Sequence, residues 1–164
     1  MPVLRLVLGD QLTRSLSALD GVAAGDPILM VEVREETTYV PHHKQKIAFI
    51  LSAMRHFADE LVKEGLTVDY VALDNRFNTG SFRGEIARAV KRHKAKRVVV
   101  THPGEWRVLD MLRSLPDEIG VPVDILPDDR FLCSTTDFAR VTARITKIMA
   151  MRLHKVAAMG FPML

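Results

Sequence analysis

Five short apolar runs alternate with helix-type patterns, and they constrain the fold of this 164-residue chain more than any other feature. The runs cover residues 3–8, 27–33, 66–73, 97–101 and 121–126. Short β-branched and leucine-rich runs of this kind are typical of strands buried on both faces of a parallel sheet. Pro122 in the last run predicts an edge strand, because proline lacks the N–H that a central strand donates.

The segments between the runs carry apolar residues at spacings of three and four, the period of an amphipathic helix. These patterns predict helices over residues 43–64, 81–93 and 105–118, with Ser81 or Asn78 as the N-cap of the second helix. Gly65 and Gly120 follow as stop signals. The alternation predicts an α/β fold: a five-stranded parallel sheet flanked by helices, with the first strand central and right-handed crossovers.

Composition excludes a disordered chain, because 48% of the residues are hydrophobic and 26% are charged. No apolar run approaches the roughly 18 residues of a membrane span, and no basic-then-apolar leader opens the chain. We therefore expect a single cytoplasmic domain with no membrane partner. The lone cysteine, Cys133, excludes an internal disulfide, and we expect a buried, inert thiol.

The net charge of +3 is too low for a dedicated nucleic-acid binder. The densest basic stretch, residues 91–97, lies between a predicted helix end and a predicted strand. Cations favour a helix C-terminus, and a phosphate-binding patch is the alternative. Residues 139–164 predict a basic amphipathic tail, which docks on its own sheet, on a partner or on an anionic surface.

Three polar segments follow predicted strands, at the sheet edge where ligands bind in open parallel sheets. Gly9-Asp10-Gln11 forms either a capping turn or a ligand contact. Residues 32–44 form a solvated helix start, a site loop or a metal site, although adjacent histidines without an HxxxH spacing argue against metal. At residues 102–107, Trp106 either stacks on a planar ligand or anchors its helix.

Standard catalytic and nucleotide motifs are absent from the sequence. We find no nucleophile elbow, glycine-rich dinucleotide fingerprint or Walker loop. We therefore assign no catalytic and no metal-ligating residue.

Several segments taken together resemble one family, the deoxyribodipyrimidine photolyase-related proteins. This family comprises the iron–sulfur bacterial cryptochromes and the prokaryotic (6-4) photolyases. The segments are LVLGDQL at 6–12, HHKQKIAFILSAMRHFADEL at 42–61, NTGSF at 78–82, THPGEWRV at 101–108 and DDRFLCS at 128–134. The resemblance fades beyond Phe138, which divides the chain into an antenna-type domain at 1–138 and a diverged tail at 139–164.

The resemblance implies a Rossmann-like antenna domain that binds a chromophore similar to 6,7-dimethyl-8-ribityllumazine. In the family, a separate helical domain holds FAD, a four-cysteine iron–sulfur cluster and the DNA-lesion pocket. This chain ends at Leu164 and has one cysteine. We therefore expect no FAD, no iron–sulfur cluster, no direct DNA binding and no DNA repair by this chain alone.

The resemblance also places the chromophore over the carboxyl ends of the first, second and fourth strands, with Leu8, Val33 and Ile47 against its ring. The candidate binding residues are Gly9, Asp10, Gln11, Glu36, Tyr39, His43, Lys44, Ile47, Glu105 and Trp106. The alternative is a ligand-free domain that self-associates, or docks on a partner, through an exposed apolar face and the tail.

Overall fold

The computed structural model describes residues 2–131 and 133–158. The chain divides into two compact units, the first ending at Arg130 and the second starting at Phe131.

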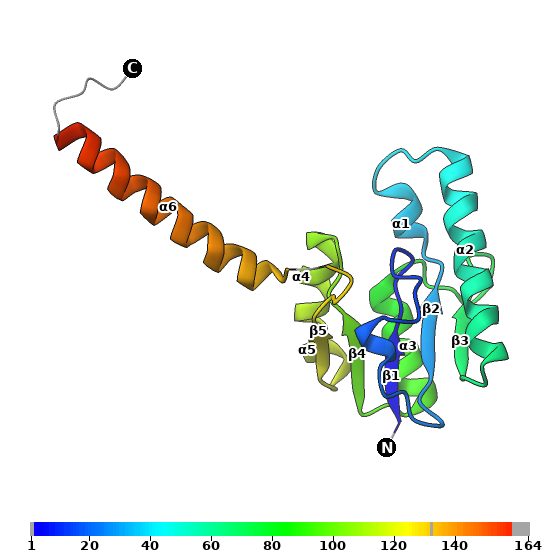
Figure 1. Cartoon of the computed structure of the whole chain (residues 1–164). Helices are drawn as coiled ribbons and strands as arrows, with labels where there is room; N and C mark the ends of the chain where they lie inside the picture. The colour runs from blue at the N-terminus through cyan, green and yellow to red at the C-terminus, as the bar shows by residue number, and fades with distance from the viewer. Residues whose placement is uncertain (1, 132, 159–164) are drawn as a thin grey trace. The chain divides into compact units, whose positions relative to one another are not determined.

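The first unit is built on a five-stranded sheet in the order β3-β2-β1-β4-β5 (Figure 1). Every pair of neighbouring strands is parallel. The strands are β1 (Val3–Leu6), β2 (Ile28–Val31), β3 (Val68–Val71), β4 (Arg97–Thr101) and β5 (Val123–Leu126). The predicted parallel α/β fold, the central first strand and the edge position of the last strand are confirmed.

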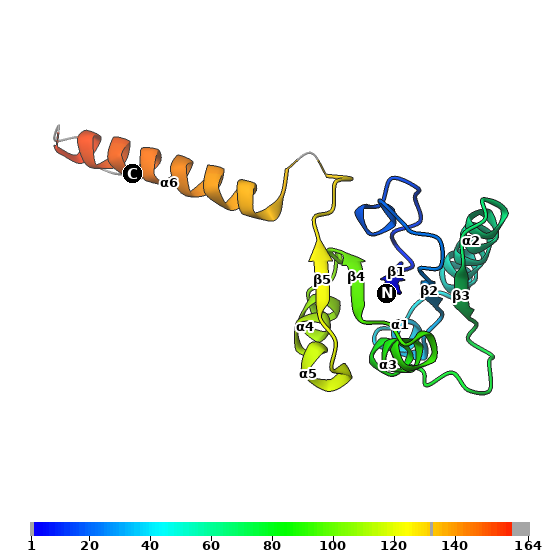
Figure 2. The same ribbon diagram turned by 90° about the horizontal axis from the view of Figure 1, so that it is seen from below.

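Helices cover both faces of this sheet, as Figure 2 shows. They are α1 (Arg34–Thr38), α2 (Lys44–Lys63), α3 (Phe82–His93), α4 (Trp106–Ser114), α5 (Pro116–Ile119) and the short 3-10 helix η1 (Ser17–Leu19). One core layer joins α3 and α4 to side chains such as Leu4 and Leu6 of β1. The other joins α2 and η1 to Ile28 and Met30 of β2. Alternate residues of each buried strand therefore serve opposite layers.

Helix boundaries differ from the prediction where proline or polar sequence intervenes. The helix expected over residues 105–118 is two helices, because Pro116 begins α5 and has no N–H to continue the ladder of α4. The short helix α1 was not predicted, since its sequence has no apolar stripe. Ser81 is the N-cap of α3 and accepts a hydrogen bond from the Gly84 N–H at 3.1 Å.

The basic stretch at residues 91–97 has structural partners. His93 lies 2.6 Å from Asp69, Arg92 pairs with the same carboxylate, and Arg97 pairs with Asp124. Lys94 ends α3 in the left-handed conformation, with φ of 51°. These contacts favour the helix-end interpretation over a phosphate-binding patch.

The second unit contains one long helix, α6 (Thr135–Ala158). The Ser134 hydroxyl oxygen accepts a hydrogen bond from the Asp137 N–H at 3.0 Å, next to the start of this helix. Cys133 is exposed, so the expectation of a buried thiol is wrong. Residues 159–164 of the predicted tail lie outside the described residues. Within the described part, no helix has the length and apolar character needed to cross a bilayer.

Candidate functional site

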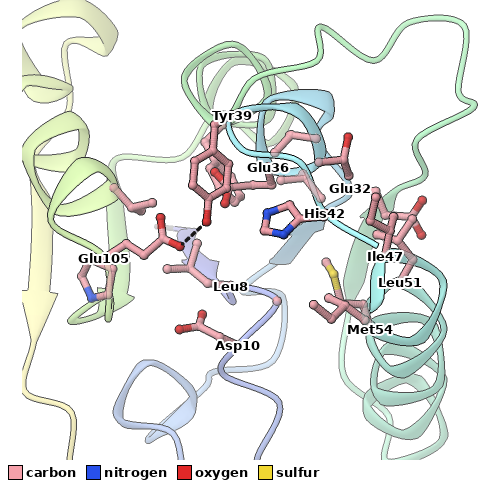
Figure 3. A pocket seen from close by; sticks show the side chains of 18 of the residues that line it. Leu8, Asp10, Glu32, Glu36, Tyr39, His42, Ile47, Leu51, Met54 and Glu105 are labelled. Carbon is pink, nitrogen blue, oxygen red and sulfur yellow. Dashed lines mark hydrogen bonds between the residues drawn. The ribbon is translucent and has the colours of Figure 1, made fainter. Parts of the chain in front are cut away.

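A pocket of about 360 Å³ lies over the carboxyl ends of β1, β2 and β4 (Figure 3). Parallel sheets of this order bind ligands at that edge, because the strand order reverses direction there. Twenty residues line the pocket: Leu8, Gly9, Asp10, Val31, Glu32, Val33, Glu36, Thr37, Tyr39, His42, Lys46, Ile47, Ile50, Leu51, Met54, Phe82, Pro103, Gly104, Glu105 and Val108.

One wall of the pocket is an apolar stripe of α2. Ile47, Ile50, Leu51 and Met54 recur at helical spacing and face the end of β1. Gly9 allows this close approach, since a Cβ at this position would lie 3.0 Å from the Met54 sulfur. The stripe of α2 and the end of β1 therefore form a slot with apolar sides.

Glu32 is a fully buried carboxylate at the base of the pocket, just beyond the end of β2. It accepts hydrogen bonds from Arg55 Nε at 2.6 Å, Arg55 Nη2 at 3.0 Å, the Tyr70 hydroxyl at 2.6 Å and the Leu73 N–H at 2.8 Å. Burial raises the pKa of Glu32, but these hydrogen bonds outweigh it and hold the pKa below its ordinary value. Glu32 is therefore an ionised structural group that joins β2 to α2 and β3.

A second polar cluster closes the opposite side. The Tyr39 hydroxyl donates to Glu105 Oε1 at 2.9 Å, the contact drawn in Figure 3. Arg107 Nη2 donates to Glu36 Oε1 at 2.6 Å and to Glu105 Oε2 at 3.2 Å. Burial raises the pKa of Glu36 above its usual value, although the Arg107 guanidinium opposes this effect. The cluster offers two carboxylates to whatever occupies the pocket.

Four further polar side chains lie in or beside the pocket. The Asp10 carboxylate faces Gly104, where an added Cβ would stand 3.4 Å from its Oδ2 atom. Arg130 Nη1 donates to the Asp10 carbonyl oxygen at 2.8 Å and so holds the turn after β1. On the α2 side, Lys46 Nζ lies 3.5 Å from His42 Nδ1. A ligand in the slot would thus meet acceptors on one side and a cation on the other.

The structure brings six of the ten candidate residues together in the pocket, namely Gly9, Asp10, Glu36, Tyr39, Ile47 and Glu105. Leu8 and Val33, expected against the ring of a ligand, also line it. Gln11 does not. The turn closed by its N–H and the Leu8 carbonyl sends its side chain into the core, where it donates to the carbonyls of Thr101 and His102.

The other three candidates also lie outside the pocket. His43 is the N-cap of α2 and accepts from the Gln45 N–H at 3.2 Å, while Lys44 begins the helix as an exposed residue. Trp106 is 70% exposed, so it does not anchor α4 in the core. The Arg113 guanidinium lies 5.5 Å from its ring centroid.

Glu32, His42 and Lys46 also line the pocket but are not among the candidate binding residues, although Glu32 and His42 lie in the segment 32–44 that was considered as a site loop. The position of Glu32 at the end of an otherwise apolar strand run could have indicated a buried carboxylate with hydrogen-bonding partners, because a buried charge requires partners. The choice between His42 and His43 depended on the starting residue of α2, which periodicity does not define. No group of three or more His, Cys, Asp or Glu side chains suited to a metal ion occurs among the described residues.

A parallel sheet of this order, with a part-apolar and part-polar pocket over the ends of its central strands, defines a Rossmann-like domain suited to a small organic ligand. Residues 5–153 match the model of the deoxyribodipyrimidine photo-lyase-related protein family. The chain belongs to this family.

A relative with a stated activity supports the same assignment. Over 139 residues the chain is 50% identical to a protein named (6-4) photolyase from Agrobacterium fabrum (strain C58 / ATCC 33970). The match covers 84% of this chain and 27% of the relative. The chain thus spans about a quarter of the length of that relative.

Proposed function

We propose that this domain binds a lumazine chromophore, similar to 6,7-dimethyl-8-ribityllumazine, and serves as a light-harvesting antenna. The observation that carries the proposal is the pocket over the ends of β1, β2 and β4, in a chain of the photolyase-related family. The cavity of about 360 Å³ lies within the range of small-ligand sites, roughly 300–1,000 Å³.

The lining of the pocket fits such a ligand. A flat heteroaromatic ring has two apolar faces, which suit the slot between Leu8 and Val33 on one side and the α2 stripe on the other. Its edge and its ribityl chain carry N–H and O–H groups that need acceptors. Asp10, Glu36 and Glu105 supply carboxylate oxygens around the same cavity.

The same carboxylates disfavour a phosphorylated ligand. A phosphate group beside Asp10, Glu36 and Glu105 meets like charges, which raise the free energy of the bound state. Two cations offset these charges in part: Lys46 lines the pocket, and Arg107 pairs with Glu36 and Glu105. We therefore expect lumazine and riboflavin to bind better than flavin mononucleotide.

The side chains of the pocket orient the ring and keep water from it. When bound, the chromophore would absorb light and pass the excitation to a flavin, as the family resemblance implies. Energy transfer breaks no bond, so the pocket requires no acid, base or nucleophile. The ionised Glu32 would hold the base of the pocket in shape through Arg55 and Tyr70.

The photolyase activity is that of the relative, of which this chain covers 27%. We propose that the chain alone binds neither FAD nor an iron–sulfur cluster and does not repair DNA. Purified chain with added FAD would be illuminated on DNA carrying pyrimidine photoproducts. Unchanged photoproduct levels are expected, and a light-dependent decrease would overturn this part of the proposal.

A fluorescence titration with 6,7-dimethyl-8-ribityllumazine tests binding. Asp10 is exposed in the ligand-free domain, so Asp10→Ala should weaken binding about 2- to 12-fold, the net contribution of one hydrogen bond, with the fold intact by circular dichroism. Lys94→Ala serves as the control, because Lys94 ends α3 at the other end of the sheet. The proposal fails if the parent chain does not bind at high micromolar ligand. The role of Asp10 fails if both variants bind as the parent does.

A further inference from the structure

The pocket is bounded by two segments that are far apart in the sequence. The first is α1 with the following turn, which contributes Glu36 and Tyr39, and the second is the turn between β4 and α4, which contributes Glu105. In Figure 3 the Tyr39 side chain reaches across to Glu105. The width of the pocket on this side depends on what holds these segments together.

Arg107 does not line the pocket, yet it contacts both segments. Its Nη2 donates to Glu36 at 2.6 Å and to Glu105 at 3.2 Å. Its guanidinium carbon also lies 4.5 Å from the centroid of the Tyr39 ring. We call Glu36, Tyr39, Glu105 and Arg107 the Arg107 clamp. One cation thus neutralises two carboxylates from separate elements and stacks on the aromatic ring between them.

The rest of α1 is held from one end. The Glu35 N–H donates to the Gly80 carbonyl at 3.0 Å, and Glu35 Oε1 accepts from the Phe82 N–H at 2.6 Å. No residue of α1 is buried, and the hydroxyls of Thr37 and Thr38 donate to the Arg34 carbonyl within the same helix. The Arg107 clamp is therefore what ties the far end of α1 to the other wall.

We propose that Arg107 is a positioning residue for the pocket, which fastens α1 to the start of α4 and slows the release of a bound ligand. The part that concerns ligand release rests on the proposed function. The part that concerns α1 is independent of any ligand. Segments with few buried contacts open locally at low free-energy cost, so loss of a clamp should appear as faster local opening.

The test compares Arg107→Gln with Arg107→Lys and with the matched control Arg97→Gln. Arg97 is also an arginine paired with a carboxylate, Asp124, but it stands at the amino end of β4, away from the pocket. Amide hydrogen exchange of residues 34–43 is measured on ligand-free protein. Dissociation of 6,7-dimethyl-8-ribityllumazine is then measured by stopped-flow fluorescence.

Arg107→Gln should increase both the exchange of residues 34–43 and the ligand dissociation rate by about 3- to 10-fold, since the ion pairs are partly exposed. Arg107→Lys should fall between this variant and the parent, because it keeps the charge and loses the stacking plane. Arg97→Gln should change neither quantity. If Arg107 only stabilised the fold, Arg107→Gln should increase amide exchange across the whole domain. Arg107→Lys should then not give values between those of Arg107→Gln and the parent.

Several results would contradict the role proposed for Arg107. The proposal is overturned if residues 34–43 exchange at the parent rate in Arg107→Gln, or if Arg97→Gln has the same effects. It is overturned for ligand release if dissociation is unchanged while exchange increases. If the parent chain binds no lumazine, the proposed function falls, and the exchange comparison alone decides whether Arg107 holds α1.

Discussion

Replacing Glu32 with glutamine should destabilise the domain more than any other single-atom change at the pocket. Glu32 is 1% exposed and accepts two hydrogen bonds from Arg55, one from Tyr70 and one from the Leu73 N–H. In Glu32→Gln one side-chain oxygen remains as a hydrogen-bond acceptor. The other is replaced by an NH₂ group, a donor that would face the donor groups of Arg55, Tyr70 or Leu73. The change therefore removes the charge and about half of the accepting capacity.

The size of the expected loss in unfolding free energy depends on how deeply Glu32 and Arg55 are buried. Breaking a fully buried ion pair costs about 3–5 kcal/mol. The Arg55 side chain is 55% exposed, so its guanidinium regains water and the cost is lower. We expect the free energy of unfolding to fall by about 2–3 kcal/mol, a fraction of the value for a fully buried pair. For a chain of this size the melting temperature should fall by about 4–12 °C.

The stabilisation by Glu32 should also be lost at low pH. The pKa of Glu32 is below its ordinary value in the folded protein, so the folded state favours the ionised form. Its stabilisation is fully present above the unfolded pKa of about 4.3 and is lost as the pH falls through the folded pKa. The stability difference between parent and Glu32→Gln should therefore be constant near pH 7 and shrink below about pH 4.3.

Urea unfolding followed by circular dichroism measures these differences, with Glu36→Gln as the comparison. Burial raises the pKa of Glu36, so its ionised form is not favoured overall, and glutamine should change stability by about 0.5 kcal/mol or less. A loss below about 1 kcal/mol in Glu32→Gln would show that the buried hydrogen bonds of Glu32 contribute little, because it falls under the smallest desolvation cost expected. An equal loss in Glu36→Gln would refute it as well.

Three further predictions concern particular positions. Gly9→Ala places a Cβ 3.0 Å from the Met54 sulfur, so it should lower the free energy of unfolding by about 1 kcal/mol in urea and weaken lumazine binding. An unchanged affinity would contradict the close approach of α2 to the end of β1. Lys94→Gly should raise stability by about 0.5–1 kcal/mol, because Lys94 has φ of 51°, and a loss of stability would argue against the left-handed C-cap of α3. Leu112→Ala should cost about 2–5 kcal/mol in the same assay, since Leu112 is fully buried in the core layer of α3 and α4, and a cost below about 1 kcal/mol would place it outside that core.

The strands and long helices could be predicted from the sequence because their burial leaves a pattern. β4 was expected over residues 97–101 and occupies that range, since four of its five positions are buried and Val98, Val99 and Val100 form an apolar run. Helix α1 leaves no such pattern, because none of its residues is buried. The break before Pro116 was readable in principle, but the apolar spacing continues across it from α4 into α5.

The location of the candidate site could be predicted from the sequence, but the direction in which each of its side chains points could not. Residues that follow parallel strands meet at one edge of the sheet, which located Gly9, Asp10 and Glu105. The direction of each side chain depends on turn geometry that composition does not encode. Gln11 shows the difference, because a turn sends its amide into the core, where it satisfies two carbonyl groups.

The pocket over β1, β2 and β4 is proposed to hold a lumazine-type ring, and this binding can be measured directly. Purified chain would be incubated with 6,7-dimethyl-8-ribityllumazine, freed of excess ligand by gel filtration and heated, and the released ligand would be quantified by mass spectrometry. We expect release of about one lumazine per chain, as for a pocket with one site, and clearly less from Asp10→Ala. No released lumazine from the parent chain, or equal amounts from the parent and Asp10→Ala, would contradict it.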